Sequence, residues 1–360
     1  MNNVTGKMHA VRIHAFGDAD VLKVENVPTP EPTAHEIVIR VRAASVNPVD
    51  FKIRSGKYPL VKEDQLPKVL GRDVAGIVEH VGAQVKGFEK GDAVYAMLGR
   101  EVGGYAEYAI ANECEAAPKP HALCFVEAAA VPLAALTAWQ GLFDHGGLKP
   151  GQRVLIHGGA GGVGHFAIQF AKAKGAWVAT TVSADDIAMA KQLGADLAID
   201  YKHDKFEERV SDIDLVFDLI AGETQKRSWA VLKNDGAMIS TLQEPDQALA
   251  KRRNIRVAHY LAKPSAKTAR RDQPAHRRWQ DQADRQRHLS ARPCGRRTSA
   301  HGARSHPGQG CARSGCLVSR ERHSLTSPMG EGAPSSRCHL KRRPYSNRAG
   351  PRRKSRDPCR

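Results

Sequence analysis

The chain has 360 residues and a formal net charge of +17, a length that accommodates about two domains. The charge is uneven, because residues 1–266 hold 31 basic and 32 acidic residues, whereas residues 267–360 hold 24 and 6. The first 266 residues therefore lack the excess charge that would draw them to nucleic acid or to an anionic membrane. Only Cys114 and Cys124 fall in that part, which favours a reducing compartment over a disulfide framework.

The N-terminal residues bear on the location of the protein. The first 15 residues lack the apolar core of a signal peptide. No later run approaches the ~20 apolar residues that are needed to span a bilayer. We therefore expect a cytoplasmic protein with no membrane partner.

Residues 8–120 carry short strand patterns separated by turn residues. Ile and Val alternate with charged residues over residues 36–46, which predicts a half-buried strand. The β-branched runs at residues 74–82 and 91–98 repeat the pattern, and glycines lie between them. These features predict a compact, mainly antiparallel domain.

From about residue 128 the pattern changes to apolar helices and strands. Residues 126–143 form a helix-favouring apolar run that Pro132 interrupts. Beyond it, apolar strands alternate with helices that end at Gly175 and Gly194. Such strands, separated by helices, predict a parallel sheet covered on both faces. The predicted strands are residues 153–158, 177–182, 213–220, 236–242 and 256–262.

A glycine-rich loop follows the first of these strands and opens a helix. Gly159, Gly161 and Gly164 match the G-x-G-x-x-G spacing of dinucleotide-binding loops, with Gly162 and Val163 between the last two. The first glycine of such a loop allows a tight turn, the second lets backbone approach the pyrophosphate, and the third lets the helix pack close to the sheet. The helix N-terminus then offers free N–H groups to the phosphates. A glycine-rich turn in an unrelated α/β fold is the alternative interpretation.

The end of the second parallel strand bears on the choice between NAD and NADP. An NAD site usually places an acidic residue there, about 20 residues after the glycines, to hold the ribose hydroxyls. Residues 180–183 contain no acid, which favours NADP(H). Asp185 and Asp186 point the other way, although Ser183 and Asp186 also have the spacing of a helix capping box.

Seven motifs, in chain order, resemble those of one superfamily. They are SVNPVDFKIRSGKYP, LGRDVAGIVEHVGAQVKGFEKGDAVYA, GGYAEYA, AAAVPLAALTAWQGL, VLIHGGAGGVGHFAIQFAKAKGA, LGADLAIDY and DLVFDLIAGETQKRSW. Over residues 8–266 the chain resembles the medium-chain dehydrogenase/reductase superfamily, in its zinc-free NADPH:quinone oxidoreductase-like branch. The resemblance implies a GroES-like, mainly antiparallel β domain at residues 1–127 and a Rossmann doubly wound parallel-sheet domain at residues 128–266.

The resemblance also implies that no metal is bound. Zinc-dependent members carry Gly-His-Glu where this chain has Gly71, Arg72 and Asp73, a cysteine near the position of Asn47, and a four-cysteine structural loop. This sequence has neither set of ligands, and zinc needs three or four protein ligands. Cys114 and Cys124 are expected to be core or surface residues.

The resemblance implies a set of site residues. Asn47, Asp50 and Lys52 would lie near the nicotinamide, and Tyr58 would stack on the acceptor. Turn chemistry around Pro48 is an equal explanation for Asn47 and Asp50, and Lys52 and Tyr58 have residue types that are common at surfaces. The implied cofactor-binding residues are Thr137 at the nicotinamide end, Ser183, Lys191 and Tyr201 at the adenosine phosphate, and Gly159, Gly161, Gly162, Val163 and Gly164 at the pyrophosphate.

Residues 267–360 are rich in arginine and show no hydrophobic period. The resemblance implies a helix and closing strands of the first domain at this point. Codon degeneracy allows residues 271–284, read one nucleotide further on, to encode EINRLIDGGKIKPI, and residues 306–314 to encode IRGKVVLE. We therefore interpret the chain from about Lys267 as translated out of frame, and we expect a disordered tail and a poorly folded or aggregating product. A basic nucleic-acid-binding extension is the alternative, although aromatic residues for base stacking are nearly absent.

These observations predict an enzyme that transfers a hydride from NADPH to a quinone or an α,β-unsaturated carbonyl acceptor, without zinc. The cofactor carries the chemistry, while the protein supplies orientation and a place for the developing oxyanion. The first alternative is a catalytically silent NADP-binding protein on the same fold, and the second is a nucleic-acid-binding protein that uses the tail. The intact family member is expected to form a homodimer and to bind no nucleic acid.

Overall fold

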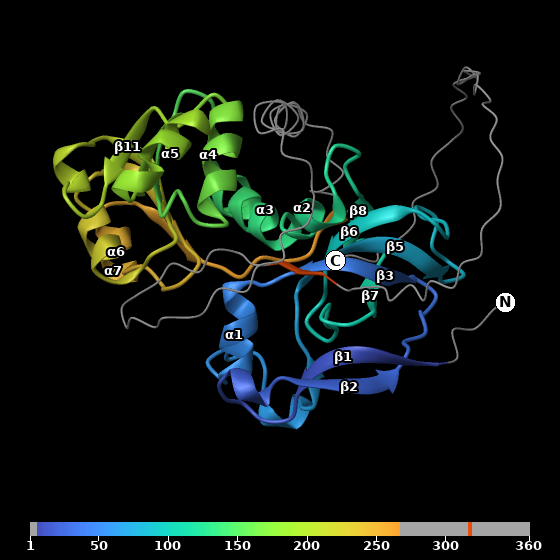
Figure 1. The fold of residues 1–360 in the computed structure, drawn as a ribbon. Coiled ribbons are helices and arrows are strands. Elements are labelled where there is room, and N and C mark those ends of the chain that lie inside the picture. The colour runs from blue at the N-terminus through green and yellow to red at the C-terminus, as the bar shows by residue number, and fades with distance from the viewer. Residues whose placement is uncertain (1–5, 267–315, 319–360) are drawn as a thin grey trace, which may run out of the picture. The chain divides into compact units, whose positions relative to one another are not determined.

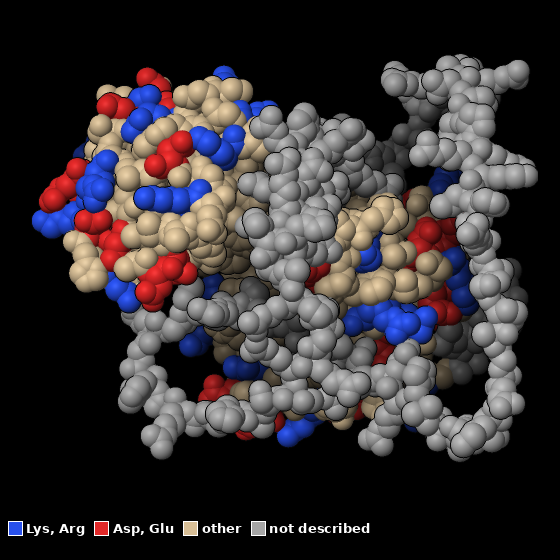
Figure 2. Space-filling model, turned by 45° about the horizontal axis from the view of Figure 1, so that its top comes forward, with Lys and Arg blue, Asp and Glu red and all other residues tan. Residues whose placement is uncertain are grey.

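The computed structural model describes residues 6–266 and 316–318, and the interpretation of the tail as a disordered, out-of-frame segment lies almost wholly outside these residues. The described part contains antiparallel sheets at its N-terminal end and one parallel sheet after them (Figure 1). On the face shown in Figure 2, acidic and basic side chains of the described residues are interspersed. None of the described helices is long and apolar enough to cross a membrane.

The larger antiparallel sheet is built around β3, which spans Glu36–Ser45. It pairs with β5 over its whole length and with β7 over its first half. Ile37 and Ile39 are fully buried, as the alternating pattern predicts, but Val38 is fully buried too. The expectation of a half-buried strand is therefore wrong at this point, because the packing covers both faces of β3. The other strands here are β1 (Lys7–Ile13), β2 (Lys23–Pro28), β4 (Lys68–Val69), β5 (Asp73–Val81), β6 (Ala93–Met97), β7 (Tyr108–Asn112) and β8 (Ala116–Pro118).

The parallel sheet has six strands in the order β11-β10-β9-β12-β13-β14. Counted from β9, this is the 3-2-1-4-5-6 order of a doubly wound dinucleotide-binding fold, so the predicted fold class is confirmed. Its strands are β9 (Arg153–His157), β10 (Trp177–Val182), β11 (Leu197–Asp200), β12 (Ile213–Asp218), β13 (Leu232–Ser240) and β14 (Arg256–His259).

Alternating side chains of this sheet enter two different apolar cores. Ile156 and Phe217 join the core formed with α4, while Leu155 and Val216 join the core formed with α7. All four side chains are essentially inaccessible to solvent. The sheet is therefore covered on both faces, with α4 and α5 on one side and α6 and α7 on the other (Figure 1).

The helices are mostly short. The apolar run at residues 126–143 forms two helices and a π-helical turn, with Pro132 at the first position of the second helix, where a proline costs no hydrogen bond. The α-helices are α1 (Pro48–Arg54), α2 (Phe125–Ala129), α3 (Pro132–Trp139), α4 (Gly164–Ala173), α5 (Ile187–Gln192), α6 (Gly222–Ser228) and α7 (Gln247–Arg252). The remaining helical turns are η1 (Ala19–Val21), η2 (Glu63–Gln65), η3 (Gln140–His145), η4 (Ala184–Asp186) and η5 (Phe206–Glu208).

One strand of the described structure comes from the tail. β15, Cys316–Val318, pairs antiparallel with Ala43–Ser45 of β3, and this differs from the expectation of a tail without regular structure. β7 pairs only with Glu36–Arg40, so the next residues of β3 have an open edge. An open edge of this kind accepts a short apolar segment such as Cys-Leu-Val.

Candidate functional site

The loop between β9 and α4 is closed to side chains at two of its glycines. A Cβ atom on Gly159 would lie 2.1 Å from Thr180 Oγ1, and one on Gly164 would lie 2.2 Å from the carbonyl oxygen of Gly158. Gly161 has more room, with its nearest contact at 3.3 Å. The positive φ of the turn falls on Gly158, at 77°, so the tight turn expected of Gly159 is made one residue earlier. Gly159 is required instead by its contact with the neighbouring strand.

The strand order places this loop at a switch point of the sheet. β9 and β12 are neighbours, and the connections that follow them run to opposite faces, which is where open α/β sheets bind ligands. Three exposed apolar side chains follow the ends of β12, β13 and β14 in turn, namely Ile220, Leu242 and Leu261. Sequence reasoning missed these residues. The signal was an apolar residue placed just beyond the end of each strand.

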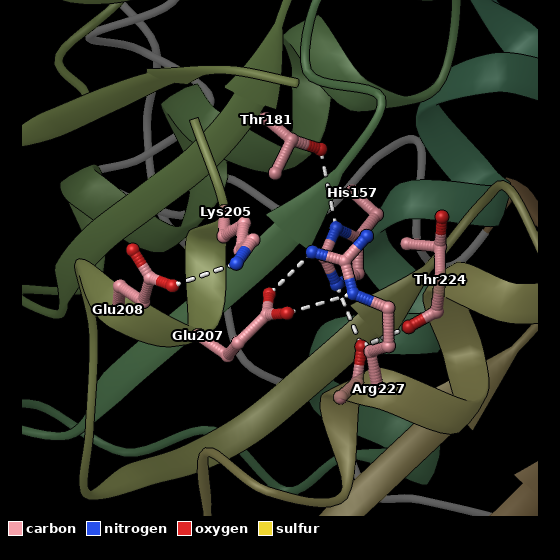
Figure 3. A network of polar contacts seen from close by, with 8 residues as sticks. His157, Thr181, Lys205, Glu207, Glu208, Thr224 and Arg227 are labelled. Atoms are coloured by element: carbon pink, nitrogen blue, oxygen red, sulfur yellow. Dashed lines mark hydrogen bonds and ion pairs between the residues drawn. The ribbon is translucent and has the colours of Figure 1, made fainter. Parts of the chain in front are cut away.

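Gly158, the first residue of the loop, is held by hydrogen bonds that run through Thr181 and His157, and Figure 3 shows these last two residues. The Gly158 N–H donates to Thr181 Oγ1 over 3.2 Å, and Thr181 Oγ1 lies 3.1 Å from Nδ1 of the fully buried His157. On the other side of the ring, Nε2 lies 2.8 Å from Ser228 Oγ, which donates to the carbonyl oxygen of Thr224. Because the Ser228 hydroxyl proton is committed, Nε2 must carry the imidazole proton and Nδ1 must accept. Burial lowers the pKa of His157 to about 4, in keeping with this neutral form.

An ion pair lies beside this chain of bonds. Arg227 donates from Nε to Glu207 Oε1 over 2.8 Å, and its guanidinium lies 4.9 Å from the centre of the Phe206 ring. The same ring packs edge-on against His157, with ring centres 4.7 Å apart. Sequence reasoning assigned no role to His157, although it directly precedes the glycine loop. Its partners lie 24 and 71 residues away.

A second group of polar side chains is buried where β3, β5 and α3 meet. Asp73, at the start of β5, is fully buried. Its Oδ2 accepts hydrogen bonds from Ser45 Oγ at 2.8 Å and Asn47 Nδ2 at 2.9 Å, and its Oδ1 accepts from the N–H of Leu133 at 2.9 Å. Burial raises the pKa of Asp73 to about 7. The carboxyl group therefore joins the antiparallel sheet to the first turn of α3.

Asp50 extends the same group from α1. Its Oδ2 accepts from the Asn47 N–H at 2.7 Å and from the Tyr105 hydroxyl at 2.9 Å. Its Oδ1 is enclosed and has no hydrogen-bond partner among the described residues. Burial raises the pKa of Asp50 to about 6. Asn47 and Asp50 thus lie together, and their bonds to each other are the turn chemistry that was the alternative explanation.

The remaining residues implied for the acceptor end are placed differently. Tyr58 is buried at 7 % exposure within the apolar core of the antiparallel region, so it is not a surface residue. Lys52 is half-buried on α1. Sequence reasoning missed two further buried cations, Lys68 and Arg72. Burial lowers the pKa of each of them.

Thr137 lies on α3 and is buried. Its hydroxyl donates to the carbonyl oxygen of Leu133 at 2.6 Å, within the same helix. Its own carbonyl oxygen accepts from the hydroxyl of Tyr260, which follows β14. The hydroxyl of Thr137 is therefore committed to its helix, and the residue joins α3 to the end of the parallel sheet.

Two of the three residues implied for the adenosine phosphate lie at the ends of β10 and β11, and the third, Lys191, lies on α5. Ser183 follows β10 and Tyr201 follows β11, and the Tyr201 N–H donates to the carbonyl oxygen of Val182 at 3.1 Å. Tyr201 and Lys191 are both exposed. The Ser183 hydroxyl donates to Asp186 at 2.6 Å, so the capping spacing corresponds to a real contact. An acid therefore lies beside Ser183, although none ends β10 itself.

The described side chains around Asp73 do not fit a zinc ion. Within residues 6–266 and 316–318, no three His, Cys, Asp or Glu side chains are grouped so that they could hold a metal ion. Asp73 stands where a ligand motif would lie, but its two oxygens accept three protein hydrogen bonds. Its neighbour Arg72 is a buried cation, which repels a metal ion. The glycine loop, in contrast, leaves the open backbone that a pyrophosphate needs.

Comparison with known proteins supports the class of protein that this fold defines, a two-part dehydrogenase. Residues 33–121 match the family model "Alcohol dehydrogenase GroES-like domain", and residues 162–253 match "Zinc-binding dehydrogenase". The chain is 36% identical to mouse "Quinone oxidoreductase" over 64% of its own length and 72% of the relative's. It is 42% identical to tomato "2-methylene-furan-3-one reductase" over 66% of its own length, and it spans 63% of that relative.

Solved structures agree with these relatives. The quinone oxidoreductase of Coxiella burnetii superposes with a TM-score of 0.68 at 35% identity, covering 78% of this chain and 88% of that one. A mycobacterial protein complexed with NADPH superposes with a TM-score of 0.63 at 30% identity, covering 79% and 89%. This chain belongs to the medium-chain dehydrogenase/reductase superfamily, in its quinone oxidoreductase-like branch.

Proposed function

We propose that this chain transfers a hydride from NADPH to a quinone or an α,β-unsaturated carbonyl acceptor, without zinc. The observation that carries the proposal is the glycine loop at the switch point, where Gly159 and Gly164 leave no room for side chains. The relatives named quinone oxidoreductase and furanone reductase support these acceptor classes.

The choice of NADPH rests on the ends of β10 and β11. β10 ends without an acidic residue, and Ser183, Lys191 and Tyr201 are the proposed contacts of the adenosine phosphate. An NADPH-dependent relative from Arabidopsis and the NADPH complex of the mycobacterial protein support the same choice. The contact between Ser183 and Asp186 counts against it, because an acid there would repel a phosphate.

At the acceptor end, the proposed residues are Asn47, Asp50, Lys52 and Tyr58. Bound NADPH supplies the hydride, and the chain must orient the acceptor and exclude water. Asn47 and Asp50 are held in place by the hydrogen bond between them, and the Tyr105 hydroxyl donates to Asp50. Lys52, which is half-buried on α1, and Tyr58, which lies in the apolar core, complete the set. Thr137 is the proposed contact on the nicotinamide side.

The proposal extends to the organisation of the chain. Residues 1–127 form the acceptor domain, residues 128–266 form the NADPH domain, and residues from about Lys267 are out of frame. The protein is cytoplasmic, and its frame-restored form is a homodimer. Sequencing the gene across codons 260–275 tests the reading frame, because a single confirmed frame without an insertion or deletion would refute the shift.

The decisive assay follows NADPH oxidation with a panel of quinones, enals and enones. It is run on the 360-residue chain and on a frame-restored chain. Turnover with either acceptor class supports the proposal. NADPH binding without turnover by the frame-restored chain would leave the catalytically silent alternative, and salt-dependent DNA binding that is lost on tail deletion would favour the nucleic-acid alternative.

A further inference from the structure

Arg72 is a buried arginine with few partners. Its side chain lies at the start of β5, and the residue is 6 % exposed. Its Nε donates to the carbonyl oxygen of Leu98 at 2.9 Å, and this is its only hydrogen bond to the described residues. A guanidinium carries five N–H groups, and a buried charge is costly unless it is paired.

The carboxyl groups near Arg72, which are those of Asp50, Asp73 and Glu115, do not complete its bonding. Asp50 and Asp73 are close enough to affect its pKa, but no ion pair joins either of them to Arg72. The oxygens of Asp73 are occupied by Ser45, Asn47 and Leu133. Burial raises the pKa of Asp50 to about 6 and that of Asp73 to about 7, so near neutral pH Asp73 carries only part of its charge. Among the described residues, no ion pair with a carboxylate therefore neutralises the charge of Arg72 directly.

The end of the guanidinium is open. Neither terminal nitrogen of Arg72 has a partner among the described residues, and neither is among the fully enclosed side-chain atoms that lack one. Both nitrogens therefore keep some access to solvent although the residue as a whole is buried. An arginine that is buried along its length and open at its end is arranged to bind an oxygen anion. Tyr58 lies nearby and interacts electrostatically with it.

We propose that Arg72 binds the carbonyl oxygen of the acceptor and stabilises the negative charge that develops on it. This inference rests on the proposed function. Hydride addition to the β-carbon of an enone breaks the C=C π bond, and the electron pair moves to make the carbonyl oxygen an enolate. The N–H groups of Arg72 hold that oxygen until a solvent proton adds to the α-carbon. The products are the saturated carbonyl compound and NADP⁺.

The test compares Arg72→Met and Arg72→Lys with Arg100→Met. Arg100 is an exposed arginine close enough to affect the pKa of Arg72, so the control removes the same charge from outside the buried region. With an enone acceptor, Arg72→Met should lower kcat by about 100- to 1,000-fold, the usual loss for one oxyanion donor. Arg72→Lys should recover part of the loss, and Arg100→Met should stay within about 2-fold. The Kd for NADPH, measured by fluorescence, should not change in any variant.

A binding measurement separates this inference from the proposed function. The probe is 4-nitrophenol, whose phenolate absorbs visible light and resembles the enolate oxygen. The wild-type chain should bind the phenolate form and lower the apparent pKa of the probe, whereas Arg72→Met should not. Phenolate binding that depends on Arg72, without reduction of any acceptor, would refute the proposed function but support an oxyanion site at Arg72.

Two results would overturn the inference. One is an Arg72→Met variant that reduces enones as fast as Arg100→Met. The other is phenolate binding that does not depend on Arg72. If Arg72→Met does not fold, Arg72→Lys decides, because it keeps the buried charge. A loss in kcat of about 10-fold at unchanged NADPH affinity supports the role, and wild-type kcat refutes it.

Discussion

The glycine loop and the polar group around Asp73 form their sites in opposite ways. At the loop, the backbone is the binding surface, and side chains are excluded by contacts as short as 2.1 Å. Around Asp73, side chains from β3, β5 and α1 bond to one another, and backbone contributes mainly through Leu133. The glycine loop requires that its residues carry no side chain, whereas the group around Asp73 requires that its side chains are hydrogen-bonded to one another. The two should therefore fail differently when a single residue is changed.

The largest expected effect is at Asp73. Asp73→Ala removes the acceptor of three hydrogen bonds, and of the three donors only Asn47 Nδ2 keeps another bond, to Ser45 Oγ. The free energy of unfolding should fall by about 3–5 kcal/mol, as measured by denaturant unfolding of the 360-residue chain. Asp73→Asn keeps one acceptor oxygen and should cost less. A loss below about 1 kcal/mol for the alanine variant would show that the group does not stabilise the fold.

The pH dependence of Asp73 has a definite sign. Its folded pKa is raised from 3.8 to about 7 by burial, so the folded state binds the proton more tightly than the unfolded state. The stability that Asp73 contributes is therefore fully present below about pH 4 and is lost as pH rises through 7. Wild type should lose stability relative to Asp73→Asn over this window. A wild-type chain that instead gains stability relative to Asp73→Asn as pH rises would contradict this sign.

The next effect is in the loop. Gly164→Val places a side chain 2.2 Å from the carbonyl oxygen of Gly158, so backbone must move. We expect an unfolding penalty of about 1–3 kcal/mol and a Kd for NADPH that is higher by about 100-fold, because the phosphate N–H groups are displaced. For the unfolding penalty, Gly161→Val is the matched control, since the nearest contact there is 3.3 Å away. Equal unfolding penalties in the two variants would contradict the steric explanation.

A smaller effect is expected from the hydrogen bonds through His157. Thr181→Val removes the hydroxyl that accepts from Gly158 and faces His157, while keeping the side-chain shape. The Kd for NADPH should rise about 5- to 10-fold, in line with one lost hydrogen bond of about 1 kcal/mol. Thr181→Ser should restore wild-type affinity. If Thr181→Ser binds NADPH as weakly as Thr181→Val, the affinity depends on the methyl group of Thr181 and not on its hydrogen bonds.

The smallest effect is at the exposed end of the cofactor region. Lys191→Ala should leave the free energy of unfolding within about 0.5 kcal/mol, because the side chain is exposed. If Lys191 contacts the adenosine phosphate, the Kd for NADPH should rise about 5-fold while that for NADH stays the same. An equal rise in the Kd for NADPH and the Kd for NADH would show that Lys191 does not contact the adenosine phosphate.

The sequence predicted a mainly antiparallel N-terminal region and a parallel sheet after it, together with most of the elements within them. Repeating apolar patterns placed β9, β10, β12 and α4 within a few residues, since each pattern follows from local geometry. The resemblance implied that Asn47 and Asp50 lie near the nicotinamide, and this stays a prediction. The sequence did not predict the burial of Tyr58 or the contact of Tyr105 with Asp50, which spans 55 residues.

By itself, the sequence determined the features that depend on spacing along the chain. These are the dinucleotide-binding loop, the parallel sheet and the superfamily. Glycines at fixed intervals and apolar periods are local properties, so they can be read without coordinates. Only the tertiary structure decided which polar groups are buried and which are paired. The tertiary structure leaves the terminal nitrogens of Arg72 without a partner among the described residues. It also places Thr181 between His157 and the N–H of Gly158. Burial and pairing depend on contacts between distant segments, and these set the protonation of Asp50 and Asp73.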